Sequence, residues 1–117
     1  MKLLVCGGRD FSDMKLVDET LNELHGRKKI TLLIHGAARG ADSLADHWAS
    51  RAGIPRKEFR ADWSMHGKAA GPLRNQKMID EGKPEMVLAF SGGRGTADMI
   101  RRAKAANIPV MEVGQCA

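Results

Sequence analysis

Three short glycine-rich segments, each with one arginine, have the composition of an anion-binding site. They cover residues 7–10, 36–40 and 92–96. Glycine lets backbone amides approach an anion closely, and arginine adds a positive charge with several hydrogen-bond donors. One glycine turn is weak evidence, because glycine ends strands in many α/β proteins. Three such turns together indicate a phosphate site.

The same segments do not match the motifs of two common classes of nucleotide-binding enzyme. No segment has the spacing of a dinucleotide fingerprint, and no Gly-Lys-Ser/Thr follows any of them. The sequence therefore disfavours a hydride-transfer enzyme and a nucleoside triphosphatase. The net charge of +5 favours anionic ligands, but it does not distinguish a polynucleotide from a small phosphate ester.

The elements that carry these segments alternate between strands and helices. Apolar runs predict buried strands over residues 3–6, 30–34, 86–90 and 108–113, and a more polar edge strand over 55–61. Helical spacing predicts a helix that starts at Ser12 or Asp13 and others over 44–53, 71–82 and after Thr96. Pro72 is expected in the first helical position and Thr96 as a cap.

This alternation predicts a single-domain, Rossmann-like α/β fold over residues 1–117, with a doubly wound parallel sheet of about five strands and helices on both faces. All three glycine segments follow strands. Because ligands of open parallel sheets bind outside the carboxyl ends of the strands, we expect the segments to form one phosphate cradle. The long connection over residues 62–71 is expected to cover it.

Two further segments offer side chains to this edge. Arg74 and Asn75 stand in the expected first turn of a helix, where they are either solvated or close enough to reach a phosphate. Trp63 lies in a polar segment, where it either stacks on a base or packs the connection onto the sheet. Trp48 lies on an apolar helix face and is expected in the core.

These motifs resemble a known family. Residues 7–11, 35–42, 70–75 and 90–96, with Trp63 and Gly67, resemble the SLOG superfamily of Rossmann-like proteins, and more closely a small YspA-like branch of bacteria and phages. The superfamily includes the LOG phosphoribohydrolases and the DNA-processing Smf/DprA proteins. The resemblance covers nearly the whole chain and implies nucleotide binding through the phosphate.

The resemblance to LOG enzymes is incomplete. Arg74 matches an arginine of their site, but Met99 stands where they place a functional glutamate. Asp98 is one residue earlier, and the helical rotation of about 100° is expected to aim it away from the pocket. The resemblance therefore implies phosphate binding more strongly than glycosidic-bond cleavage.

Three functions remain open at this point: a nucleotide-binding protein that cleaves or transfers at an N-glycosidic bond, a non-catalytic sensor or sequestering module, and a nucleic-acid binder of the DNA-processing type. The candidate carboxylates for catalysis are Asp42, Asp98 and Asp10, each of which could instead cap a helix. The expected ligand-binding residues are Gly7, Gly8, Arg9, Gly36, Asp42, Trp63, Arg74, Asn75, Gly92, Gly93, Gly95 and Thr96.

Other features narrow the setting. Cys6 and Cys116 lack the spacing of a disulfide scaffold, and the four histidines lack metal-ligand spacing, so we expect a reducing compartment, no metal and no cofactor. The apolar run at the amino terminus is too short for a signal peptide, and no run is long enough to span a membrane. We expect a cytoplasmic protein, with a homo-oligomer left open.

Overall fold

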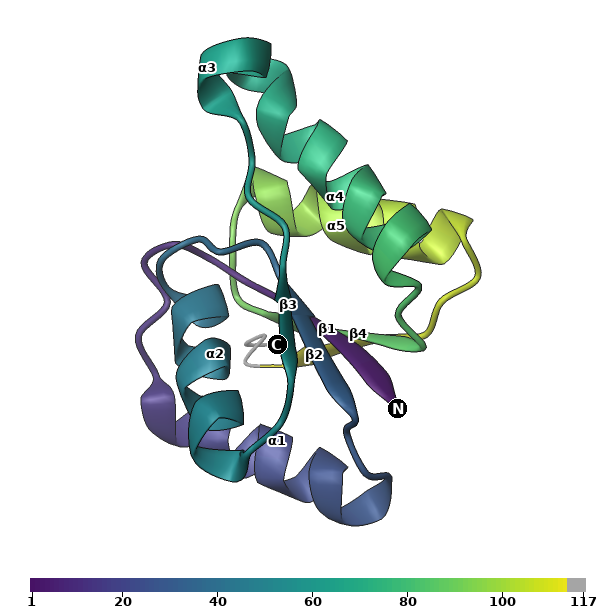
Figure 1. Ribbon diagram of the computed structural model, residues 1–117. Coiled ribbons are helices and arrows are strands. Elements are labelled where there is room, and N and C mark those ends of the chain that lie inside the picture. The colour runs from purple at the N-terminus through teal and green to yellow at the C-terminus, as the bar shows by residue number, and fades with distance from the viewer. Residues whose placement is uncertain (114–117) are drawn as a thin grey trace.

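A computed structural model describes residues 1–113 and shows a five-stranded sheet between two layers of helices (Figure 1). The strands are β1 (Lys2–Cys6), β2 (Leu32–His35), β3 (Arg56–Glu58), β4 (Met86–Phe90) and β5 (Val110–Val113). The helices are α1 (Met14–Arg27), α2 (Ala41–Ala52), α3 (Trp63–His66), α4 (Ala70–Gly82) and α5 (Arg94–Ala105), with a 3₁₀ turn η1 (Gly67–Ala69). All neighbouring strands pair in parallel, which confirms the predicted doubly wound α/β fold.

The strand order is β3-β2-β1-β4-β5. The chain moves outward from β1 through β2 to β3, and then returns through α3 and α4 to add β4 and β5 on the other side of β1. The order therefore reverses between β1 and β4. In open α/β sheets the ligand crevice lies outside the carboxyl ends of the strands at this point.

The core has two halves, one on each face of the sheet. Successive side chains of β1 point to opposite faces, so Leu3 and Val5 pack with α1 and α2 while Leu4 and Cys6 pack with α4 and α5. Trp48 is only 3% exposed in the first half, which confirms the core prediction. Its Nε1 donates a hydrogen bond to Asn22 at 2.8 Å, so the one polar atom of the indole is satisfied.

Four of the five predicted strands differ from those observed, and only the strand over residues 86–90 has the predicted bounds. β1 begins one residue earlier than predicted, at Lys2, and β5 begins two residues later, at Val110. The second strand begins two residues later than predicted, because Ile30 and Thr31 lead into it without ladder pairing to β1. The edge strand β3 spans only three residues, all exposed, although its place at the sheet edge is as predicted. Cys116 lies outside the described residues, and within residues 1–113 no helix is long and apolar enough to cross a membrane.

The helix starts also differ from prediction, and α2 begins at Ala41, three residues before the predicted range. The connection over residues 62–71 is not a loop, because the Asp62 side chain caps Met65 and starts α3. α4 therefore already begins at Ala70, so Pro72 is not its first residue. α5 begins at Arg94 with Gly93 as its cap residue, so the prediction that Thr96 caps this helix is wrong. Asp13 caps α1, one of the two residues predicted to do so.

Candidate functional site

A groove of about 720 Å³ opens at the carboxyl end of β1, next to the turn after β4, where the strand order reverses. Its walls come from the turn after β1, from α3, and from the first turns of α4 and α5. Most of the predicted site residues line it together: Gly7, Gly8, Arg9, Asp42, Trp63, Arg74, Asn75, Gly93, Gly95 and Thr96. Gly36 and Gly92 line neighbouring hollows instead, and so does Asp10.

The glycines at this edge serve two different purposes. A Cβ on Gly7 would lie 2.5 Å from that of Ala41, and one on Gly8 would lie 3.0 Å from the Ser91 carbonyl oxygen. A Cβ on Gly92 would collide with the Thr96 side chain. These glycines let the turns after β1 and β4 pack against each other and against α2. Packing within the protein therefore explains why these three positions need glycine.

Gly93 and Gly95 are different, because a Cβ on either would meet no atom within 4 Å. Both line the groove at the start of α5. Open space beside a glycine in a groove leaves the backbone accessible to a bound molecule. This pair, unlike the tightly packed glycines, has no packing explanation.

The amino-terminal end of α5 supplies donors to the same place. Gly93 has no side chain to cap the helix, and the amides of residues 94–96 have no acceptor within the helix by its geometry. The helix macrodipole adds a partial positive charge there. Open glycines beside free helix amides are the arrangement with which many proteins bind anions.

Asn75 connects α4 to this first turn. It is 5% exposed, and its Nδ2 donates to the Gly95 carbonyl oxygen at 3.2 Å and to Asp98 Oδ2 at 3.0 Å. Its Oδ1 accepts from Arg74 Nε at 3.1 Å. Asn75 therefore holds the start of α5 in position relative to α4 and is largely withdrawn from solvent.

The structure corrects the expected orientation of Asp98. Asp98 lines the groove, whereas Met99 is fully buried in the core half beneath α4 and α5. The prediction that Asp98 points away is wrong, because Met99 and Ala103, one helical turn apart, set the core face of α5. Met99 therefore does not occupy a groove position.

Asp98 is held by three donors. Arg101 Nη2 donates to Oδ1 at 2.8 Å, and Arg102 Nε and Asn75 donate to Oδ2. Burial raises the pKa of the Asp98 carboxyl, but the hydrogen bonds from Arg102 and Asn75 and the charges of the two arginines outweigh it, so its pKa lies below the usual value. Asp98 is therefore ionised at neutral pH.

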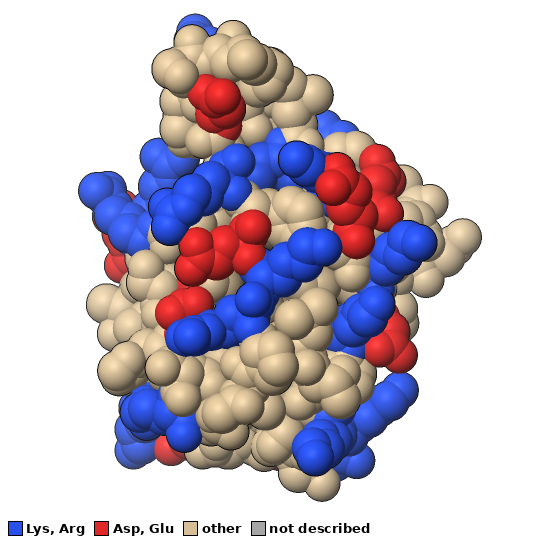
Figure 2. Space-filling model, in the orientation of Figure 1, with Lys and Arg blue, Asp and Glu red and all other residues tan. Residues whose placement is uncertain are grey.

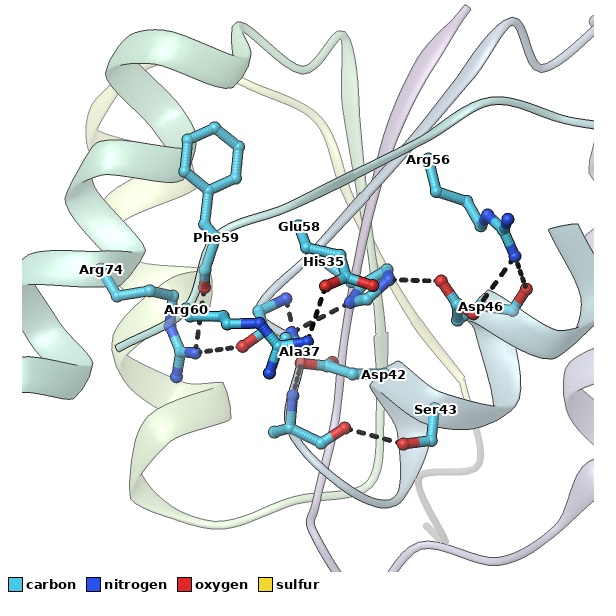
Figure 3. A network of polar contacts seen from close by, with 12 residues as sticks. His35, Ala37, Asp42, Ser43, Asp46, Arg56, Glu58, Phe59, Arg60 and Arg74 are labelled. Carbon is cyan, nitrogen blue, oxygen red and sulfur yellow. Dashed lines mark hydrogen bonds and ion pairs between the residues drawn. The ribbon is translucent and has the colours of Figure 1, made fainter. Parts of the chain in front are cut away.

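Asp42 and Arg74 meet around the turn after β2 (Figure 3). Asp42 Oδ2 accepts from the amides of Gly36 at 3.0 Å and Ala38 at 3.2 Å, and Arg74 Nη1 donates to the Gly36 carbonyl oxygen at 2.6 Å. Burial raises the pKa of Asp42, although these amides and the charge of Arg74 oppose it. Burial also lowers the pKa of Arg74, which Asp42 opposes. Asp42 of α2 and Arg74 of α4 therefore both hold the turn after β2, each through its own hydrogen bond to Gly36.

Cys6 lies at the floor of the groove without being reactive. Burial, with the nearby charges of Asp42 and Glu112, raises the pKa of its thiol to about 12. The thiolate is the nucleophilic form of cysteine. Cys6 therefore stays protonated near neutral pH and contributes packing.

Trp63 stands at the groove mouth. It is 49% exposed, and the guanidinium of Arg9 lies 5.3 Å from its ring centroid in a cation–π contact. Of the two predicted roles for Trp63, packing onto the sheet does not fit this exposure. Asp10, in contrast, is solvent-exposed and pairs with Arg39 at 3.4 Å, outside the groove.

Several basic residues around the groove were not among the predicted ligand-binding residues. Lys68, Arg94 and Arg101 line it, while Arg39 and Arg60 line an adjoining hollow. Arg39 and Arg94 belong to the glycine segments, so the same pattern could have identified them. Arg60 and Lys68 have no local sequence signal, because their position depends on how α3 follows β3.

His35, Asp46 and Glu58 each bring one possible metal-ligand atom within 4.8 Å of the others (Figure 3). They come from three elements, so the histidine spacing did not reveal them. Nδ1 of His35 accepts the Ala37 amide at 3.0 Å, which leaves the proton on Nε2 to donate to Asp46 Oδ1 at 2.8 Å. Both ring nitrogens are therefore used, and the histidine supports the turn after β2.

Comparisons with known proteins agree with this fold. The Gene 61 protein of Mycobacterium phage D29 is 41% identical over 123 residues, covering 97% of this chain and 96% of that protein. The X-ray structure of DNA processing protein A (DprA) from Streptococcus pneumoniae matches with a TM-score of 0.77 at 19% identity. The match covers 98% of this chain and 50% of that chain, so this chain spans half of the DprA structure. At this identity the likeness shows the fold.

The family comparison covers the glycine turns after β1 and β2. Residues 1–66, more than half of the 117-residue chain, match the family described as YAcAr. The match includes Arg9, Gly36, Asp42 and Trp63 of the groove and its neighbouring hollow. The chain belongs to the YspA, cpYpsA-related SLOG family.

Proposed function

We propose that this protein binds a nucleotide or nucleotide-derived ligand in the groove, with a phosphate at the first turn of α5. The observation that carries the proposal is the uncapped start of α5, where Gly93 and Gly95 leave open space beside amides without helical acceptors. Arg94 and Arg74 line the same groove and add positive charge. The SLOG family membership agrees with a nucleotide ligand.

The base would contact the half-exposed ring of Trp63 at the groove mouth. Stacking on an aromatic ring contributes about 1–3 kcal/mol per base and tolerates different bases. Arg9 now covers that ring, so a base either displaces its guanidinium or lies on the opposite side. The phosphate would then fix the ligand and Trp63 would orient it.

Binding without cleavage fits the carboxylates of the groove best. Asp98 accepts hydrogen bonds at both oxygens, and Asp42 accepts two backbone amides at Oδ2. Cleavage of an N-glycosidic bond needs a carboxylate near the developing positive charge of the sugar. Asp42 Oδ1 takes no part in these backbone contacts. Asp42, rather than Asp98, is therefore the candidate carboxylate for such a reaction.

A nucleic-acid binder is the second candidate, supported by the net charge of +5 and by a fold shared with a DNA processing protein. Its binding would weaken steeply as salt increases, since several phosphates are neutralised at once. A single nucleotide phosphate gives a much weaker salt dependence.

The substitution Gly95→Leu tests the proposal. Gly95 and Gly26 are both helical, neither has a positive φ, and a Cβ on either would meet no atom within 4 Å. Gly26→Leu is therefore a matched control at the far end of α1. We expect both variants to fold at least as stably as wild type, because leucine favours helices over glycine by up to about 1 kcal/mol.

Ligand binding should separate the two variants. In thermal-shift titrations with the four nucleoside monophosphates, wild type and Gly26→Leu should be stabilised and Gly95→Leu should not, because its side chain fills the space beside the amides. Chromatography of the same mixtures reports any released base. A folded Gly95→Leu that binds like wild type would place the phosphate elsewhere.

A further inference from the structure

A second hollow of about 410 Å³ adjoins the groove and is lined by four arginines, Arg9, Arg39, Arg60 and Arg74. The turn after β2 and the segment that leads from β3 into α3 line it. Arg9, Ala38, Trp63 and Arg74 line both spaces, so the hollow and the groove are continuous along these residues. One ligand can therefore extend from one space into the other.

The two spaces differ in charge. Asp42 and Asp98 line the groove, whereas no acidic residue lines the hollow within the described part of the chain. Figure 2 shows that Lys and Arg side chains also gather across the middle of this face, below the projecting α3, with acidic side chains between some of them. Several like charges around one hollow repel each other, and an anion relieves that repulsion.

The arginines are only partly neutralised. No carboxylate in residues 1–113 lies within ion-pair distance of Arg9 or Arg74. Arg39 pairs with Asp10 at 3.4 Å and Arg60 with Glu58 at 3.0 Å, and both pairs are largely exposed. Exposed ion pairs contribute little stability, so either arginine can turn toward an anion at small cost.

We infer that the hollow is a second anion subsite and that the ligand is a dinucleotide with two separate phosphate groups. This inference rests on the proposed function, which places the first phosphate at α5. The second phosphate lies among Arg39, Arg60 and Arg74, and the ring of Trp63, shared by both spaces, contacts the base between them. Arginine binds phosphate through several parallel donors, which suits this cluster.

A longer single strand fits the structure less well. Binding along a strand requires several aromatic side chains on which successive bases stack. Of the five aromatic residues in the sequence, Trp63 alone is exposed: Trp48, Phe59 and Phe90 are buried, and Phe11 is half-buried against Phe90. One ring between two anion positions matches a dinucleotide.

Calorimetric titration of Arg60→Gln tests the subsite. Arg60 lines the hollow and not the groove. The control Arg51→Gln also removes one positive charge and one exposed ion pair, the 2.7 Å pair with Asp18, but at the carboxyl-terminal end of α2. The ligands are the four nucleoside monophosphates, the four 5′-phosphorylated homodinucleotides, and a 12-nucleotide single strand of each base. Arg39→Gln is the second variant.

Wild type should bind its preferred dinucleotide about tenfold or more tightly than the matching monophosphate, as expected for one added charge-assisted contact. Arg60→Gln and Arg39→Gln should remove most of this advantage and leave the monophosphate affinity unchanged, while Arg51→Gln alters neither. Dinucleotides that bind no more tightly than monophosphates, or an equal loss in Arg51→Gln, would overturn the second subsite.

Two further outcomes separate this inference from the proposed function. Monophosphate binding that survives Gly95→Leu, or is absent from wild type, contradicts the phosphate position at α5 itself. Twelve-nucleotide strands that bind far more tightly than dinucleotides, with a steep loss as salt increases, assign both subsites to a polynucleotide and overturn the dinucleotide.

Discussion

At the scale of single residues, Asp98 shows how a carboxylate in a groove can be structural. It is 8% exposed and receives donors from Arg101, Arg102 and Asn75, which use both of its oxygens. Its ionised form is stabilised by these contacts, so its pKa lies below the usual value despite burial. A carboxylate in this state joins α4 to α5 and is a poor general base, because it has little tendency to accept a proton.

Asp98→Asn should therefore lower the free energy of unfolding at pH 7 by about 1.5–3 kcal/mol, the contribution of a hydrogen bond to a charged group. Because the folded-state pKa is lowered, this stabilisation is present above the unfolded-state pKa of about 3.9 and is lost as pH falls through the folded-state value. The gap between variant and wild type, measured by urea unfolding, should shrink below about pH 4.

Asp10→Asn is the control, since Asp10 is exposed and its pair with Arg39 is long, so its effect should be close to zero at any pH. A gap for Asp98→Asn that stays constant down to about pH 2 would show that the ionised carboxylate is not what stabilises the fold.

At the scale of elements, the start of α5 depends on α4. Asn75 is the direct link, because it bonds to Gly95 within the first turn of α5 and to Asp98 one turn later. The neighbouring Gln76 also reaches α5, where its Oε1 accepts from Arg102 Nη1 at 2.9 Å, but it does not contact the first turn. Substitutions of these two residues can therefore distinguish a loss of helix packing from a displaced first turn of α5, where we propose that the phosphate binds.

Asn75→Ala should weaken nucleoside monophosphate binding and lower stability by about 1–3 kcal/mol, because it leaves the Gly95 carbonyl group without this donor. Gln76→Ala should lower stability by a smaller amount and leave the binding affinity unchanged. Thermal unfolding and calorimetric titration of both variants give the two quantities. Equal affinities for wild type and Asn75→Ala would show that the link does not position the site.

The elements also show what the sequence could and could not predict. The buried strands and the edge position of β3 follow from apolar runs and from Pro55, which are local properties. α3 was missed because a four-residue helix capped by Asp62 has no apolar repeat. The prediction of which face of α5 lines the groove was wrong. It was based on the position of Met99 relative to Thr96 in the motif, whereas the spacing of Met99 and Ala103 marks the core face of the helix.

At the scale of the whole molecule, the topology gathers the site from segments far apart in the sequence. The turns after β1 and β4 meet only because the strand order reverses between these strands, and glycines allow their close contact. For this reason most of the residues that line the groove could be named from the sequence, since parallel strands end at one edge. The hollow of arginines could not, because it requires the path of the chain from β3 into α3.

The central claim, that a nucleotide phosphate binds at the first turn of α5, is tested most directly by amide NMR. The backbone amides of residues 94–96 are followed while each nucleoside monophosphate, and then the matching nucleoside, is added to wild type. We predict saturable shifts of these three amides with the preferred monophosphate and much smaller ones with its nucleoside, because only the phosphate accepts their hydrogen bonds. Saturable binding that leaves these amides unshifted, or equal shifts with monophosphate and nucleoside, would contradict the account.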